Sequence, residues 1–289
     1  MHLSELLRRK TALSFEVFPP KLDHPIEPLL DTLEKLYAFR PDFISCTYGA
    51  CGSNKGRNLD IVASIQKRGV CEALSHYTCV GNSQQDISNA LDEYVSIGVN
   101  NLLALRGDFP NGAANAAGAF SYASELIAFI RDRWPSVCIA AGCYPEKHLL
   151  ADSLESDIGH LLEKQEAGAS VLMSQLCYHP EALFRFRDLA HKRGVVLPIV
   201  VGVLPVIRKD GLIRMTLSNG CSIPAELSEL IGRYGDDEAA FRSAGRDFTV
   251  RLIERYRSEG VDGIHIYTLN RYEDVAGIVA GAGLSNGIC

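Results

Sequence analysis

The 289-residue sequence lacks the paired cysteine and histidine motifs that hold metals, although it contains nine cysteines. There is no C-x-x-C, H-E-x-x-H or C-x-x-C-H motif, which argues against a zinc, iron–sulfur or haem site. The cysteines are odd in number, and several lie in apolar, strand-like runs. We therefore expect no metal site, and we expect the free thiols of a cytoplasmic protein from a reducing compartment.

Long apolar runs and a strong charge of one sign are also missing. The longest apolar runs are about strand length, well short of the roughly 20 residues that cross a bilayer, so no membrane span is expected. Residues 1–10 lack the apolar run and cleavage site of a secretory signal, and they predict a short amphipathic helix. A net charge of -6 argues against nucleic acid as a partner. Any anionic ligand must therefore meet a local basic site.

Two phosphate-binding signatures are absent, G-x-G-x-x-G after a strand and G-x-x-x-x-G-K-[ST]. The nearest match begins at Gly281, at the C-terminus, with no helix to follow. This absence argues against a Rossmann-type dinucleotide site. The phosphates of any bound dinucleotide must then meet side chains and helix N-termini.

What the sequence does contain is eight short apolar runs that alternate with longer segments of helical periodicity. Such alternation is typical of a parallel sheet with covering helices, and eight strands are the number that closes a (β/α)8 TIM barrel. The predicted strands are residues 13–18, 43–47, 73–79, 101–106, 137–143, 170–176, 198–203 and 263–267. The predicted helices between them are residues 28–39, 59–67, 86–97, 122–133, 152–166 and 180–192.

A repeated joint favours one continuous barrel over residues 1–289, with no linker. Glycine ends five predicted helices just before a strand, because it adopts the left-handed conformation that closes a helix at little cost. These glycines are Gly69, Gly98, Gly168, Gly194 and Gly260. The segment between strands seven and eight is longer, and it predicts an extra helix near 223–234 before a long helix at 238–257. A doubly wound sheet is the alternative architecture.

In such a barrel the site lies at the C-terminal ends of the strands. Glu16 stands there in an apolar run, alternating with Phe15 and Val17. We expect desolvation to raise the pKa of Glu16 and to keep it protonated, as a general acid requires. A buried glutamate paired with an arginine is the alternative interpretation.

Other polar residues near strand ends have structural alternatives of their own. Asp108 could form a local salt bridge with Arg106, and His76 could be a satisfied core residue. Gln175 could cap its strand, and Lys164, on the helix before strand six, could be a solvated surface charge. From the residues alone these alternatives stay open.

Taken together, these segments resemble the methylenetetrahydrofolate reductase family over nearly the whole chain. Any one segment is weak, but eight in this order at strand ends are specific. They are SFEVFPPK at 14–21, TYGA at 47–50, HYTC at 76–79, ALRGD at 104–108, YPEKH at 144–148, Gln175, LPV at 204–206 and YTLNR at 267–271.

The resemblance implies FAD at the top of the barrel, reduced by NADH or NADPH, and hydride transfer from flavin N5 to the methylene carbon of 5,10-methylenetetrahydrofolate. It implies that Glu16 is the general acid that protonates folate N10 and that Asp108 lies between flavin and pterin. Gln175, Tyr267 and Arg271 would bind substrates. The implied FAD-contacting positions are Thr47, Tyr48, Ala50, His76, Arg106, Gly107, Asp108, Ala123, Tyr144, His148, Ala151, Asp157 and Lys164, the last near the pyrophosphate.

The chain departs from the better-known bacterial members of that family in two places. It has 207-Ile-Arg-Lys-209 where they carry a phenylalanine that stacks on both substrates, and His160 and Glu163 replace residues that help to hold FAD. These departures bear on the choice between NADH and NADPH and on the affinity for FAD. The resemblance also implies a homo-oligomer and leaves room for a separate electron-donating subunit.

Two other functions remain open from the sequence. One is a folate-binding or electron-relay component without independent activity, which the altered segment 207–209 would suit. The other is a barrel enzyme of different chemistry, such as an aldolase or isomerase. A Schiff-base aldolase needs a lysine at a strand end. The polar residues at the ends of the predicted strands include no lysine, and they are Glu16, 47–48, His76, 106–108, 144–146, Gln175 and 267–271.

Overall fold

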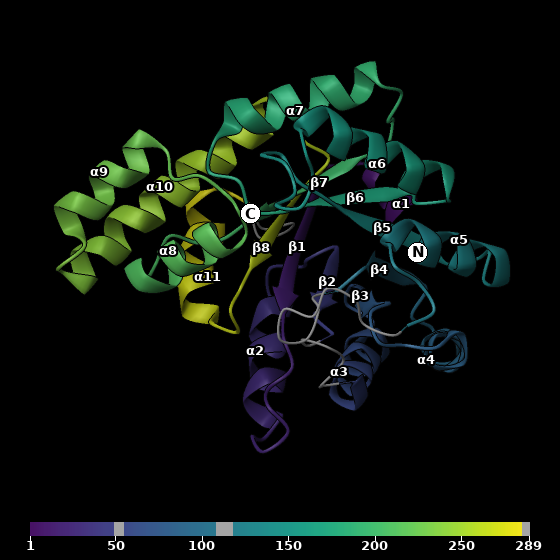
Figure 1. Ribbon diagram of the computed structural model, residues 1–289. Coiled ribbons are helices and arrows are strands. Elements are labelled where there is room, and N and C mark those ends of the chain that lie inside the picture. Colours follow the sequence, from purple (N-terminus) through teal and green to yellow (C-terminus); the bar gives the residue numbers. More distant parts are fainter. Residues whose placement is uncertain (49–54, 108–117, 285–289) are drawn as a thin grey trace.

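The computed structural model describes residues 1–48, 55–107 and 118–284. In this part of the chain, eight parallel strands form a closed barrel in chain order (Figure 1). All eight predicted strands are confirmed, each within two residues of its expected ends, so the barrel and not the doubly wound sheet is the architecture. The strands are β1 (Ala12–Val17), β2 (Phe43–Cys46), β3 (Glu72–Thr78), β4 (Asn101–Leu105), β5 (Cys138–Cys143), β6 (Val171–Ser174), β7 (Ile199–Val203) and β8 (Gly263–Tyr267).

Helices cover the outside of the barrel and bury one apolar stripe each against it. On α2, for example, Leu29, Leu33 and Leu36 are buried at the three- and four-residue spacing of one helix face. The covering helices are α2 (Glu27–Tyr37), α3 (Lys55–Arg68), α4 (Gln84–Ser96), α5 (Ala123–Arg133), α6 (Leu154–Glu166), α7 (Pro180–Lys192), α10 (Glu238–Ser258) and α11 (Tyr272–Gly281). All six helices predicted between the first seven strands are confirmed.

The short helix α1 (Leu3–Leu7) closes the N-terminal end of the barrel. Its leucines Leu3, Leu6 and Leu7 form one buried cluster with inward-facing strand residues such as Phe43 and Val200. The helix is also tied down by polar contacts, since the backbone N–H of Leu3 donates to the Asn101 side chain at 3.0 Å. This end of the barrel is therefore filled with apolar side chains, and polar side chains of the interior lie toward the opposite end.

The strand register stacks these polar side chains in the upper part of the interior. Glu16 of β1 pairs with Ser45 of β2 on one side and with Tyr267 of β8 on the other. Because alternate residues of a strand face opposite sides, the neighbours Phe15 and Val17 point outward into the cluster beneath the helices. The predicted alternation along β1 is thus confirmed.

The segment between β7 and β8 holds three helices where the sequence predicts two. The expected helices are present as α9 (Ala225–Tyr234) and α10, and α8 (Lys209–Ser218) was missed. The sequence of α8 contains Gly211, which disfavours a helix, and its buried face consists of only Leu212 and Thr216. Figure 1 shows α8 and α9 grouped with α10 to one side of the strands. The helix α11 was also missed.

A close backbone approach fixes α10 against the segment after β7. Gly245 of α10 lies so near Val206 that a Cβ atom at position 245 would overlap the Val206 carbonyl oxygen. Beside this contact, the backbone N–H of Val206 donates to the Thr249 hydroxyl at 3.1 Å. The Thr249 hydroxyl in turn donates to the Gly245 carbonyl at 2.8 Å. The glycine therefore lets the helix pack directly on the chain that leads from β7 to α8.

Two further findings bear on the expectations from composition. Seven cysteines fall within the described residues, and all seven are free thiols. None of the helices in the described ranges is both long and apolar enough to cross a membrane.

Candidate active site

Most of the site residues expected from the sequence line two adjoining cavities at the C-terminal ends of the strands. The Glu16 cavity, of about 270 Å³, lies over the barrel interior. The Lys164 cavity, of about 410 Å³, lies above β4 and β5. Leu105, Gly142 and Tyr144 line both. Of the predicted residues, the first cavity collects Glu16, Thr47, His76, Tyr144, Gln175 and Tyr267, and the second collects Arg106, Ala123, Tyr144, His148, Ala151, Asp157 and Lys164.

A third and larger cavity, the Arg271 cavity, has a volume of about 790 Å³. It lies between α8 and the turn after β8, and it shares Met215 and Tyr267 with the Glu16 cavity. Arg271 lines it, with its guanidinium 3.6 Å from the Asp274 carboxylate. The three cavities therefore form a connected series with Glu16 in the middle member.

Two of the predicted residues that the structure describes, Tyr48 and Gly107, do not line these cavities. The Tyr48 ring is buried against Tyr77, with ring centroids 4.8 Å apart, and it lines a separate small cavity between α3 and α4. Gly107 follows Arg106 with a positive φ of 89°, and a Cβ there would stand 2.9 Å from Thr78. Ala50 and Asp108 lie outside the described residues.

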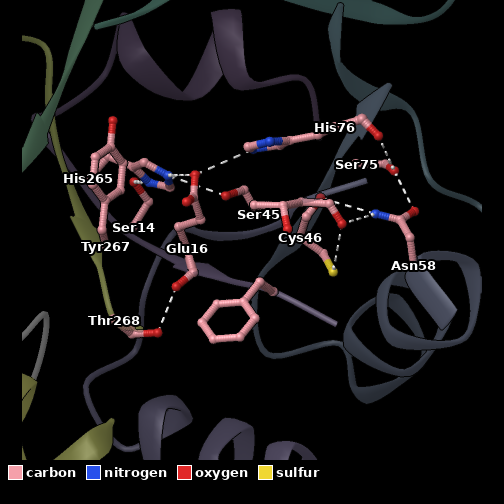
Figure 2. A network of polar contacts seen from close by, with 12 residues as sticks. Ser14, Glu16, Ser45, Cys46, Asn58, Ser75, His76, His265, Tyr267 and Thr268 are labelled. Atoms are coloured by element: carbon pink, nitrogen blue, oxygen red, sulfur yellow. Dashed lines mark hydrogen bonds and ion pairs between the residues drawn. The ribbon is translucent and has the colours of Figure 1, made fainter. Parts of the chain in front are cut away.

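The carboxylate of Glu16 faces polar groups that the sequence did not indicate, in a cavity whose lining also includes apolar side chains such as Leu103 and Met173. Figure 2 shows it between the rings of two histidines, with His76 Nε2 at 3.6 Å and His265 Nε2 at 3.7 Å. Its side chain keeps 23% of its surface exposed to the cavity. Within the described residues, the alternative of a buried glutamate paired with an arginine is also wrong, because the side chains that lie against its carboxylate are histidines.

The pKa of Glu16 is lowered, which corrects the expectation that it would be raised. Burial does act to raise the pKa of this carboxyl, as the sequence argument assumed. The interactions with His265 and His76 oppose this effect and outweigh it, since a hydrogen-bond donor or a positive charge stabilises the carboxylate. Near neutral pH the ligand-free protein therefore holds Glu16 as an anion.

His265, which was not predicted from the sequence, links Glu16 to two serines. Its Nδ1 lies 2.8 Å from the Ser14 hydroxyl, and its Nε2 lies 3.2 Å from the Ser45 hydroxyl. The Ser14 hydroxyl donates its hydrogen to the Ile264 carbonyl at 3.2 Å, so it must accept from Nδ1–H. A second proton on the ring would then lie on Nε2, facing Glu16. The alternation of β8 could have indicated this residue, because His265 precedes the selected Tyr267 by two positions and shares its face.

His76 is buried and lacks a hydrogen bond at Nε2 within the part of the chain that the structure describes. Burial lowers the pKa of His76 to about 4, because the uncharged ring is favoured there and the attraction of Glu16 offsets only part of this effect. His76 is thus a neutral ring with one unsatisfied nitrogen on the wall of the Glu16 cavity. The alternative of a satisfied core histidine is not supported.

We expect His76 to make folding sensitive to mild acid. An unfolded histidine titrates near pH 6.5, whereas the pKa of His76 in the fold is about 4. Between these values the unfolded chain binds more protons, so stability falls as the pH falls. The protein should lose about 2 to 3 kcal/mol more free energy of unfolding between about pH 7 and pH 4.5 than its His76→Gln variant does.

Urea unfolding of both proteins at the two pH values measures this difference. The Glu16 carboxyl acts in the same direction but at lower pH, because its pKa is lowered in the fold. The stability that it contributes is present above the pKa of an unfolded glutamate and is lost as the pH falls further. Equal losses in the two proteins would show that His76 is not the group responsible.

The turn after β8 holds the backbone of Glu16 and of the strand end beyond it. The Thr268 N–H and hydroxyl both donate to the Glu16 carbonyl, at 3.1 and 2.6 Å. The Asn270 side chain bonds both backbone groups of Phe18, accepting from its N–H at 3.1 Å and donating to its carbonyl at 2.8 Å. Asn270 has a positive φ of 56°, a conformation that asparagine tolerates better than most residues. These contacts fix the position from which the Glu16 side chain enters the cavity.

The Lys164 cavity carries positive charge on a fixed side chain. The Lys164 ammonium donates to the Gly142 carbonyl at 2.9 Å, and burial lowers its pKa. The alternative of a solvated surface lysine is therefore wrong. Nearby, Asp157 accepts from the backbone N–H of His148 at 2.8 Å and so holds the loop that carries it. The two departing residues His160 and Glu163 pair with each other at 3.2 Å on the exposed rim of this cavity.

The amino-acid sequence matches the family model described as methylenetetrahydrofolate reductase over residues 2–283. It is 32% identical over 288 residues to Methylenetetrahydrofolate reductase (NADH) 1 of Arabidopsis thaliana, an alignment that covers 95% of this chain and 49% of the plant protein. The chain thus spans about half the length of that relative. It is 30% identical over 261 residues to the 5,10-methylenetetrahydrofolate reductase of Escherichia coli, with 90% of this chain and 87% of the bacterial protein covered.

Among solved structures, a protein from Clostridium thermocellum has a similar fold, with a TM-score of 0.65 over 98% of each chain at 16% sequence identity. It is described as an uncharacterized protein that binds two copies of 5-methyl-5,6,7,8-tetrahydrofolic acid. At this level of identity the likeness shows the fold alone. The family match over residues 2–283, together with 30% identity to a bacterial relative of which 87% is covered, shows that the chain belongs to the methylenetetrahydrofolate reductase family.

Proposed function

We propose that this protein reduces 5,10-methylenetetrahydrofolate to 5-methyltetrahydrofolate, with FAD as its cofactor, NADH or NADPH as the electron donor and Glu16 as the proton donor. The observation that carries the proposal is the position of the Glu16 cavity, which shares lining residues with a cavity on either side. The Lys164 cavity on one side suits a cofactor, and the Arg271 cavity on the other suits a substrate with an anionic tail. Family membership supports the same reaction.

The residues of the Lys164 cavity fit the parts of a flavin dinucleotide. Arg106 and Lys164 supply positive charge for its phosphates, and the Tyr144 ring supplies an aromatic surface. In the adjoining Glu16 cavity, the unsatisfied Nε2 of His76 offers a polar atom to a ring system. When bound there, the flavin would supply the hydride that NADH or NADPH gives and the folate receives. We propose Ala50 and Asp108, which lie outside the described residues, as further contacts on the basis of the family resemblance alone.

On the other side, Gln175, Tyr267 and Arg271 would bind the folate. Tyr267 is held in place because its hydroxyl donates to the Ser174 carbonyl at 3.1 Å, and it lines both the Glu16 cavity and the Arg271 cavity. Arg271 would attract the carboxylates of the folate tail. A pterin placed between Tyr267 and Gln175 would then lie over the Glu16 carboxyl.

The proton for the folate must arrive at Glu16 when the ligand binds, since the free carboxyl is ionised near neutral pH. A bound ring system would cover the exposed part of the Glu16 side chain and strengthen the desolvation that favours the protonated form. His265 Nε2, at 3.7 Å, is placed to share that proton. Glu16 would then donate to the folate nitrogen, which opens the five-membered ring and produces the cation that accepts hydride.

Anaerobic spectroscopy of the purified protein tests the proposal. We expect flavin absorbance that bleaches on addition of NADH or NADPH and returns on addition of methylenetetrahydrofolate. Protein that binds no added FAD would refute the flavoenzyme assignment. Flavin that is reduced by dithionite but by neither nicotinamide would refute the proposed donor and indicate a separate electron-donating subunit.

A further inference from the structure

We propose that Asn219, at the end of α8, is a positioning residue that holds the amino group of the Gln175 side chain in place, so that the amide of Gln175 faces its ligand in one fixed orientation. Both residues line the Glu16 cavity. The Gln175 Nε2 donates to Asn219 Oδ1 at 2.9 Å, which is the contact that joins the two amides. This inference rests on the proposed function, because it assigns Gln175 to ligand binding.

The direction of the two amides is set by backbone groups at both ends. At one end, Asn219 Nδ2 donates to the Met215 carbonyl at 2.8 Å. A carbonyl can only accept, so the amino group of Asn219 must point to it and the Oδ1 must point to Gln175. At the other end, Gln175 Oε1 accepts from the Leu176 N–H at 2.8 Å, and an N–H can only donate. Reversing either side-chain amide would place a donor against a donor at one of its two contacts and an acceptor against an acceptor at the other.

This arrangement leaves Gln175 with a defined pattern for a ligand. One hydrogen on Nε2 and one lone pair on Oε1 remain unused after the contacts with Asn219 and Leu176. A ligand that carries an acceptor beside a donor, such as the amide edge of a pterin or a carboxamide, can satisfy both. If Asn219 were lost, only the Leu176 N–H would hold the Gln175 amide, at its oxygen. Its Nε2 could then swing away from the ligand, and a buried acceptor of the ligand would be left unpaired.

The position of Asn219 explains why α8 belongs to the site. The helix ends there, and its last turn is closed by the backbone N–H of Asn219, which also donates to the Met215 carbonyl at 3.3 Å. The side chain of Met215 lines the Glu16 cavity as well. A helix inserted between β7 and β8 thus sets the orientation of a residue at the end of β6.

A double-mutant cycle with Asn219→Ala and Gln175→Ala tests the inference. The affinity for 5-methyltetrahydrofolate, measured by calorimetry on the flavin-loaded proteins, should fall roughly 10- to 100-fold in each single variant. The double variant should bind about as weakly as Gln175→Ala alone, because Asn219 acts through Gln175. The KM for methylenetetrahydrofolate should rise in parallel, with a smaller change in kcat.

Asn219→Asp serves as the matched control. It keeps an oxygen that accepts from Gln175, while it replaces the donor to Met215 by a second acceptor and adds a negative charge. It should therefore bind the folate more tightly than Asn219→Ala does, though less tightly than the unaltered protein. The inference is overturned if the two single effects add in the double variant, or if Asn219→Ala lowers the urea midpoint and the flavin content without a specific loss of folate affinity. Failure of the proposed function would look different, since the unaltered protein would then not bind or turn over the folate at all.

Discussion

Glu16→Gln should slow the reduction of methylenetetrahydrofolate by about 10² to 10⁴-fold, the range expected for loss of a general acid. Glutamine is close in size to glutamate and can keep its place between His76 and His265, but it has no acidic proton to give. Reduction of the flavin by NADH or NADPH needs no proton from this residue. It should therefore proceed at a nearly native rate.

Stopped-flow spectroscopy separates the two steps, because the flavin bleaches in the first and regains its colour in the second. Glu16→Asp is the matched variant, since it retains a carboxyl group but withdraws it by one methylene. It should recover part of the lost rate. Native folate reduction by Glu16→Gln would exclude Glu16 as the proton donor, and an equal loss in both steps would point to damage to flavin binding.

Gly245→Ala should be strongly destabilising, with a loss of about 3 kcal/mol in the free energy of unfolding, at the upper end of the cost of overpacking. The new methyl group would overlap the Val206 carbonyl oxygen. Backbone cannot rotate away as a side chain can, so α10 must shift. A shift would also strain the hydrogen bond that the Val206 N–H donates to the Thr249 hydroxyl, which joins the helix to the segment after β7.

Urea unfolding of the variant and of Gly232→Ala provides the comparison. Gly232 lies in α9, and a Cβ there would meet nothing within 4 Å. The same substitution should therefore leave stability unchanged or raise it by up to about 1 kcal/mol, as alanine favours a helix over glycine. Similar effects at the two positions would contradict the close approach at Gly245.

The barrel was predictable from sequence because each strand carries its own signal. The glycines at the helix ends were equally informative, since Gly69 and Gly98, for example, do adopt the positive φ that their position requires. The helix α8 escaped prediction because only Leu212 and Thr216 are buried along it, which gives no clear stripe. Its place in the fold is decided by contacts with distant segments.

For the site, the sequence identified residues better than it identified their environment. The residues selected for the Glu16 and Lys164 cavities came from many strand ends, and the structure brings most of them together. The apolar surroundings expected for Glu16 were inferred from its neighbours in sequence, which face the helices. The polar groups near its carboxylate include Ser45 and His265, which lie on the two strands that pair with β1. Register between strands, which a single sequence does not reveal, decided the sign of its pKa shift.

The contacts of Thr268 and Asn270 with the end of β1 join the first strand of the barrel to the last. Glu16, the proposed general acid, lies on β1. Arg271, the positively charged residue proposed to bind the folate tail, follows β8. A chain that has not yet been synthesised through β8, or a fragment that lacks β8, cannot bring Glu16 and Arg271 together. Catalysis of this kind can begin only when the ring of strands has closed, so activity should report completion of the fold more directly than helix content does.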